Sequence, residues 1–332
     1  MRHSGRRSRL PAALLPAALL LAASLAAGCG GSGSSGSSGS GPEKTTLTVA
    51  ALPLVDDAGL YIAQKRGLFE AEGVKVRIKP VQQSIQALPA LAKGDVDVIA
   101  AANYVTFLQA QDKGTLKLRV LAGAATVTSH MMDVVVLPDS PIRTAKDLEG
   151  KRVAVNILNN IQSLTLDEIL KAGGADASKV EYVAIPFPQM AATLQNKQVD
   201  AVHIVEPFLT DAKRKLGARV VVDGGGPPVT DLPISGYVST EEFAAKNPRA
   251  AAAFQRAIAK AQGLAAGDRT QVEAVVPGYA RIDAKTAAAI TLPGYPASVD
   301  AASLQRVADL MRSAGLLKRP LDVKTVLVQP SP

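Results

Sequence analysis

Cysteine and tryptophan are almost missing from this sequence of 332 residues, which has one cysteine, Cys29, and no tryptophan. A single cysteine excludes a disulfide bond within the chain. The absence of tryptophan removes one common means of stacking a ligand against a protein surface. A fold of this chain must therefore be held by its apolar core, for which 47% of hydrophobic residues provide ample material.

Catalytic signatures are also missing. The sequence has no GxSxG, HExxH or Walker motif and no spaced set of cysteines and histidines. Beyond the first 28 residues there are two histidines, His130 and His203. His203 has apolar neighbours and is expected to be structural, whereas His130 fits either a ligand contact or a contact at a crossing between lobes. We therefore expect a binding protein without catalytic residues, metal or cofactor.

The N-terminal segment has the pattern of a secretory signal. Residues 1–9 carry four arginines and no acid, and residues 10–27 are apolar apart from Ser24. The alternative, a transmembrane anchor, needs about 20 continuous apolar residues, and Pro11 and Pro16 interrupt this stretch. Without the four arginines the net charge of +8 falls to +4, and no basic cluster with interleaved aromatics follows. Nucleic-acid binding is therefore not expected.

The sequence Ala-Ala-Gly-Cys at residues 26–29 resembles the lipobox of bacterial lipoproteins. In that family the cysteine is acylated and becomes the mature N-terminus. The resemblance implies a signal peptide at residues 1–28, lipidation of Cys29, and a tether over residues 29–44. It also implies attachment to the extracytoplasmic face of the cell membrane. The twelve Gly and Ser residues from Gly30 to Gly41 would span about 20 Å as a flexible chain.

From Thr45 onward, short apolar strands alternate with amphipathic helices, which predicts parallel βαβ units and an α/β fold. The pattern runs through residues 45–128 and starts again over residues 129–237. Residues 233–240 are expected to form a return strand, and residues 238–332 a C-terminal helical segment that returns to the first unit. We therefore expect two lobes, with the C-terminal boundary the least defined.

The two units share a spacing that points to a site. In each unit a leucine is followed by four residues and then by Val-Asp. The leucine is Leu91 in the first unit and Leu194 in the second. Six residues beyond each aspartate lies a polar residue that opens a helix, Asn103 in the first unit and Glu206 in the second. Ligands of open α/β sheets bind beyond the carboxyl ends of the strands, so these positions would converge on one cleft. The alternative is that all βαβ segments look alike over so short a stretch, in which case the shared spacing indicates no site.

Longer motifs are similar to those of the bacterial solute-binding proteins that serve ABC importers of nitrate, sulfonates, taurine and thiamine-pyrimidine precursors. They lie at residues 58–63, 67–69, 90–97, 147–151, 205–207 and 303–317. The resemblance implies a periplasmic-binding-protein-like fold of type II, with two α/β lobes, a hinge and a ligand cleft. It implies capture of a small solute by lobe closure and delivery to an ABC permease with its ATPase. The same lobes would equally suit a sensory lipoprotein, and a pyrimidine-synthase-like enzyme is disfavoured because its cysteine-rich stretch is missing.

The candidate ligand-binding residues lie at the starts of helices and at strand ends, and most of them also have a structural interpretation. The amides and hydroxyl near residue 160 offer donors or cap their own helix. The carboxylates disfavour a purely anionic ligand, so a taurine-like amine or an aminopyrimidine fits better than nitrate. The aromatic residues form either a wall of the cleft or the core, and Phe187 is expected to lack regular structure because prolines flank it. The candidates are Asp56, Asp57, Ser84, Asn103, Tyr104, Asn159, Asn160, Ser163, Phe187 and Glu206.

Overall fold

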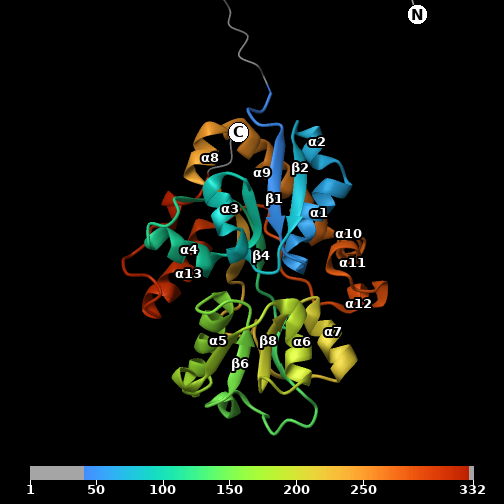
Figure 1. Cartoon of the computed structure of the whole chain (residues 1–332), viewed down its shortest axis with the longest axis vertical. Helices are drawn as coiled ribbons and strands as arrows, with labels where there is room; N and C mark the ends of the chain where they lie inside the picture. The colour runs from blue at the N-terminus through green and yellow to red at the C-terminus, as the bar shows by residue number, and fades with distance from the viewer. Residues whose placement is uncertain (1–40, 329–332) are drawn as a thin grey trace, which may run out of the picture. The chain divides into compact units, whose positions relative to one another are not determined.

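The computed structural model describes residues 41–328, so the expected signal peptide, Cys29 and most of the tether lie outside the described residues. Within the described part, two five-stranded sheets form two lobes, one above the other in Figure 1. In that part of the chain no helix is long and apolar enough to cross a membrane.

The sheet of the first lobe has the order β2-β1-β3-β10-β4. Strands β1, β2 and β3 are parallel, and β10 runs antiparallel between β3 and β4. Every residue of β3 is buried, as expected for a central strand covered on both faces. The bounds are β1 Thr46–Ala51, β2 Lys75–Pro80, β3 Val98–Asn103, β4 Leu118–Thr126 and β10 Pro233–Thr240.

The sheet of the second lobe has the equivalent order, β7-β6-β8-β5-β9. Strands β6, β7 and β8 are parallel, and β5 runs antiparallel between β8 and β9. Each sheet therefore contains one strand, β10 or β5, that the chain enters directly from the other lobe. The bounds are β5 Met132–Val136, β6 Arg152–Val155, β7 Glu181–Ala184, β8 Ala201–Val205 and β9 Arg219–Asp223.

Helices cover both sheets. Helices α5, α6 and α7 belong to the second lobe, and the long helix α9 packs on the first lobe, where Gln262 donates to the carbonyls of Gly123 and Ala124 in β4. The bounds are α1 Ala58–Lys65, α2 Leu68–Ala71, α3 Leu88–Lys93, α4 Tyr104–Asp112, α5 Ile161–Ala172, α6 Phe187–Gln195, α7 Phe208–Leu216, α8 Glu241–Lys246, α9 Pro248–Gly267, α10 Arg269–Glu273, α11 Val276–Ala280, α12 Ala284–Ala289 and α13 Ala301–Ser313.

The chain crosses between the lobes at residues 127–131 and 224–232. The return strand has the expected bounds, Pro233–Thr240, and it belongs to the sheet of the first lobe. The expected lobe boundary at residue 238 therefore falls inside this strand, and residues 233–237 belong with the first lobe. The segment after α9 also contacts the second lobe, since the Arg214 guanidinium of α7 donates to Thr286 Oγ1 of α12 at 2.5 Å.

Candidate functional site

A small cavity of about 40 Å³ lies between the two lobes. It is placed beyond the carboxyl ends of β1, β3, β6 and β8, where the shared spacing predicts a site. The residues around it are Leu52, Leu54, Asp56, Ser84, Ala101, Asn103, Ile234 and Ser235 of the first lobe, and Met132, Asn156, Asn160, Ile161, Phe187 and Val205 of the second.

Asp56 is the one charged side chain among the described residues that line this cavity. It is 4% exposed, and it accepts a hydrogen bond of 2.6 Å from Ser235 Oγ of β10. Burial raises the pKa of Asp56, and the hydrogen bond from Ser235 opposes part of this effect. The cavity therefore holds a carboxyl group, with no lysine or arginine among its described lining residues to neutralise it.

Asn103 and Ser84 meet at the cavity. Asn103 ends β3 and caps α4, since its Oδ1 accepts from the backbone N–H of Thr106 at 2.9 Å. Its amide nitrogen lies 3.4 Å from Ser84 Oγ. The cap uses the oxygen of the side chain, and the amide nitrogen donates to the hydroxyl of Ser84, which also lines the cavity. Capping and a position in the site are therefore compatible at Asn103.

Asn160 is the N-cap of α5. Its Oδ1 accepts from the backbone N–H groups of Gln162 and Ser163, and Ser163 Oγ bonds back to the backbone of Asn160. Asn160 lines the cavity, whereas Ser163 does not. Asn159 is exposed and adopts a left-handed backbone with φ of 53°, so its side chain lies outside the cavity.

Asn156 is a site residue that the sequence analysis missed. It follows β6 directly and is 3% exposed, and its side-chain amide nitrogen has no hydrogen-bond partner among the described residues. Its backbone is already engaged, because its N–H donates to Gln162 Oε1 at 2.7 Å. A buried amide donor without a protein partner costs free energy, about 1–3 kcal/mol, that an acceptor on a ligand would recover. The signal in the sequence was a polar residue at the carboxyl end of a predicted strand.

Three further candidates do not line the cavity. Asp57 is fully buried and accepts from the backbone N–H of Leu52 at 2.9 Å, and burial raises its pKa. Tyr104 packs in the core beneath the sheet. Glu206 accepts from the N–H and hydroxyl of Thr210 and from the N–H of Thr291, and burial raises its pKa. These side chains brace the structure around the site.

Phe187 lines the cavity, as expected, but for a different reason. It is the first residue of α6, with Pro186 as N-cap and Pro188 in the first turn. The flanking prolines thus start a helix, where a missing N–H is tolerated, and do not remove regular structure. The ring of Phe187 stacks on that of Phe208 with centroids 6.4 Å apart.

The lobes touch each other beside the cavity. Gln83 Nε2 of the first lobe donates to the carbonyl of Asn156 at 2.5 Å. Gln109 Nε2 of α4 donates to the carbonyl of Asn159 at 2.7 Å. Both hydrogen bonds join one lobe directly to the other.

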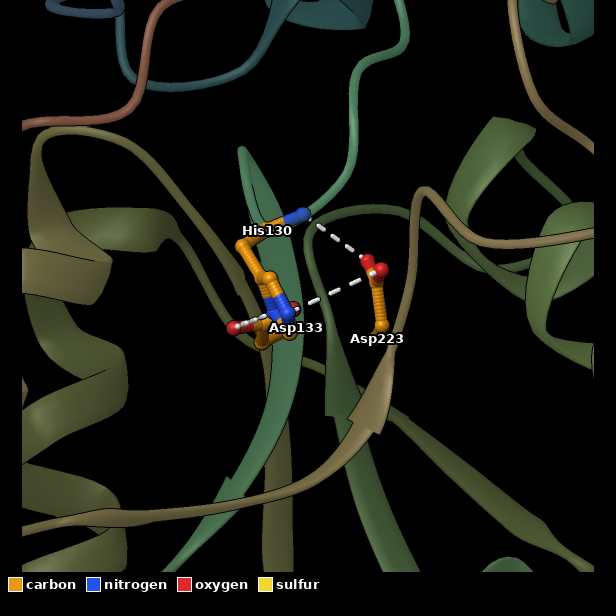
Figure 2. Close-up of side chains that lie close together, drawn as sticks. All are labelled: His130, Asp133 and Asp223. Atoms are coloured by element: carbon orange, nitrogen blue, oxygen red, sulfur yellow. Dashed lines mark hydrogen bonds and ion pairs between the residues drawn. The ribbon is translucent and has the colours of Figure 1, made fainter.

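His130 lies at the first crossing between the lobes, away from the cavity. Its ring lies between two carboxylates (Figure 2), with Nδ1 3.2 Å from both oxygens of Asp133 and Nε2 3.9 Å from Asp223 Oδ2. Asp223 also accepts from Ser129 Oγ and from the backbone N–H of His130 and of Gly225. These hydrogen bonds lower the pKa of Asp223 although burial opposes them, whereas burial raises the pKa of Asp133.

Of the two roles expected for His130, the geometry thus matches a contact at the crossing. Among the described residues, one group of side chains could hold a metal ion, and it consists of His130, Asp133 and Asp223. Each offers one ligand atom, and these atoms lie within 4.8 Å of one another. In the structure the imidazole ring itself joins the two carboxylates. The group connects residues 129–133 to the end of β9, where the second crossing begins.

Known proteins share this architecture. The alkanesulfonate-binding protein SsuA from Xanthomonas axonopodis pv. citri, solved with MOPS bound, superposes with a TM-score of 0.74 at 21% identity, covering 86% of this chain and 99% of the other. The desulfurization enzyme DSZB superposes with a TM-score of 0.64 at 17% identity, covering 86% and 96%. The expected periplasmic-binding-protein-like fold is therefore confirmed, and it occurs in a binding protein and in an enzyme.

The sequence comparisons agree with the fold. The nitrate/nitrite binding protein NrtA of Nostoc sp. (strain PCC 7120) is 25% identical over 239 residues, covering 66% of this chain and 54% of NrtA. The model of the family described as NMT1/THI5 like matches residues 55–271, which include four of the five strands of the first lobe, all strands of the second and most of the residues around the cavity. This chain belongs to the NMT1/THI5-like family.

Proposed function

We propose that this protein is an extracytoplasmic solute-binding lipoprotein that captures a small organic solute between its lobes and delivers it to an ABC permease with its ATPase. The fold and the family support the binding role, because its relatives include proteins named for binding alkanesulfonates and nitrate. The observation that carries the choice of solute is Asp56, buried at the cavity without a neighbouring cation among the described lining residues.

The chemistry around Asp56 favours a solute that bears a hydrogen-bond donor or an amine. An anion placed against the Asp56 carboxyl group finds no cation among the described lining residues, whereas an ammonium or amino group can donate to the carboxyl oxygens. The amides of Asn103 and Asn156 would donate to acceptors elsewhere on the solute. A taurine-like amine or an aminopyrimidine satisfies both features, and nitrate satisfies only the second.

A calorimetric screen of taurine, simple alkanesulfonates, nitrate and an aminopyrimidine tests this proposal. Asp56→Asn retains the shape of the side chain and an acceptor for Ser235. It should lower the affinity for an amine-bearing solute by at least about tenfold, a loss of about 1.4 kcal/mol or more of binding free energy. The exposed Asp95→Asn is the matched control and should leave the affinity unchanged.

One result would contradict the proposed head-group chemistry: the parent binds a purely anionic solute tightly, and Asp56→Asn weakens the binding of that anion by the same factor of about ten. The same samples should be assayed for conversion of each solute. Because the fold also occurs in an enzyme, turnover of a bound solute would overturn the binding-only role.

The lipid anchor rests on the sequence around Cys29. Cys29→Ser should move the protein from the membrane fraction to the soluble fraction and leave solute affinity unchanged, since the described lobes begin after the tether. Stable attachment needs more than one acyl chain, at about 0.8 kcal/mol per buried CH₂. A Cys29→Ser protein that still sediments with membranes in high salt would refute the anchor.

A further inference from the structure

The inner cavity is too small for a whole organic solute. At about 40 Å³ it has room for about three water molecules, and thus for a head group of a few atoms. A second hollow of about 830 Å³ lies beside it and shares Leu52 with it. This volume is within the range of sites that bury an entire small ligand, about 300–1,000 Å³. We call this second hollow the outer groove.

The outer groove is bounded by both lobes and by the segment around α11. Its walls include Tyr61 of α1, Phe208 of α7 and Tyr279 of α11. The rings of Tyr61 and Tyr279 are stacked, with centroids 3.9 Å apart and planes 8° apart. The stack covers the facing sides of the two rings and fixes both side chains before any ligand arrives, which lowers the entropy cost of packing a flat or apolar group against the rest of the pair.

The residues that line the groove contact those that line the cavity. Tyr279 donates its hydroxyl to the carbonyl of Leu54 at 2.9 Å, and Leu54 lines the inner cavity. On the opposite lobe, Phe208 of the groove stacks on Phe187 of the cavity. A solute whose head group lies in the cavity would therefore have its remaining atoms directed along the groove past Leu52.

The charge in the groove differs in sign from that in the cavity. Arg281, which follows α11, is the one charged residue among the described residues that line the groove. It is exposed, and no hydrogen bond or ion pair of its side chain is found within the described chain. The groove thus combines apolar aromatic walls with a single available guanidinium, and the cavity supplies a carboxyl group.

We propose that the outer groove is a second binding subsite, and that the solute is elongated, with a donor-bearing head, an apolar or aromatic middle and a distal anionic group near Arg281. This inference rests on the proposed binding function and specifies its class of solute. It assigns the stacked tyrosines and Phe208 to the middle of the solute.

The test is a fluorescence titration with 8-anilinonaphthalene-1-sulfonate. Its aromatic rings and sulfonate match the walls and the arginine of the groove, and it has no ammonium head group for the cavity. The full chain is used with Cys29→Ser in every sample, so that no detergent is needed. We expect one saturable site. Arg281→Gln should weaken dye binding about fivefold, as removal of an exposed charge partner does, and Phe208→Leu should weaken it by a similar factor.

Arg319→Gln removes an exposed arginine from another part of the chain and serves as the control for the change in net charge. Dye binding that does not saturate, or that is unchanged in both Arg281→Gln and Phe208→Leu, overturns the inference. So does an equal loss in Arg319→Gln. If the groove variants behave as expected while no amine-bearing solute gives heat in the screen, the proposed head-group chemistry fails and the groove stands. If an amine binds and the dye results are negative, the groove alone fails.

Discussion

We expect the single residue His203 to make the stability of the protein depend on pH. It lies in β8 with its side chain fully buried, and burial lowers its pKa to about 4 from the ordinary value of 6.5, with the backbone of Gln162 opposing part of the shift. Between these two values the unfolded chain binds a proton that the folded protein does not. The stability is therefore fully present above pH 6.5 and is lost as the pH falls toward 4, by about 3 kcal/mol.

Urea unfolding between pH 4.5 and 7.5 measures this loss. His203→Leu has a similar volume and cannot be protonated, so its free energy of unfolding should fall less over this range than that of the parent. Other groups titrate in both proteins, and the difference between the two curves isolates His203. Parallel curves for parent and variant would show that His203 has no such role.

Residue-scale predictions of the site were limited by side-chain direction. Asn103, Asn160, Asp56, Ser84 and Phe187 line the cavity as the sequence suggested. The other candidates lie beside it, because spacing along a chain identifies the backbone positions near a strand end but does not orient their side chains. Asn156 was not predicted because the expected strand included it, whereas β6 ends at Val155 and Asn156 is the first residue beyond the strand.

At the scale of elements, the alternation of strands and helices was predictable and the pairing of strands was not. Apolar periodicity is local, so the bounds of β10 could be predicted from the sequence. The exchange of β5 and β10 between lobes depends on contacts between distant residues. The sequence signalled it only through the resemblance to a known family.

The shared spacing of the two units shows how far a repeat can be used. It equates Asn103 and Glu206, which lie at the carboxyl ends of the equivalent strands β3 and β8 of the two lobes. Asn103 caps its helix and keeps its amide at the cavity. The Glu206 carboxylate instead joins Thr210 of α7 to Thr291 of the C-terminal segment, so it couples the second lobe to the segment that follows α12. Equivalent backbone positions have thus taken different tasks.

At the scale of the whole molecule, hydrogen bonds and apolar packing both join the lobes beside the cavity. The lobes are covalently joined through two crossings, and the group of His130, Asp133 and Asp223 holds the crossings together. Such a clamp would act as a fixed base about which the lobes rotate. A solute that contacts both lobes would then shift the population toward the closed form.

The hydrogen bonds from Gln83 and Gln109 to the opposite lobe should therefore influence the population of closed molecules without solute. We expect the double variant Gln83→Ala/Gln109→Ala to have a larger radius of gyration than the parent in small-angle X-ray scattering, because two inter-lobe bonds are lost. The matched control is Gln189→Ala/Gln198→Ala, which removes two exposed glutamines of the second lobe.

The solute identified by calorimetry should bring the parent and the double variant to the same smaller radius, at a higher concentration for the variant. The higher concentration is needed because the apparent affinity for the solute is proportional to the fraction of molecules that is closed without solute, and this fraction is smaller in the variant. Identical radii for parent, variant and control, with and without solute at saturation, would contradict capture by closure. A larger radius for the variant that solute does not reduce would show that the two glutamines hold the lobes together but that the solute binds only one of them.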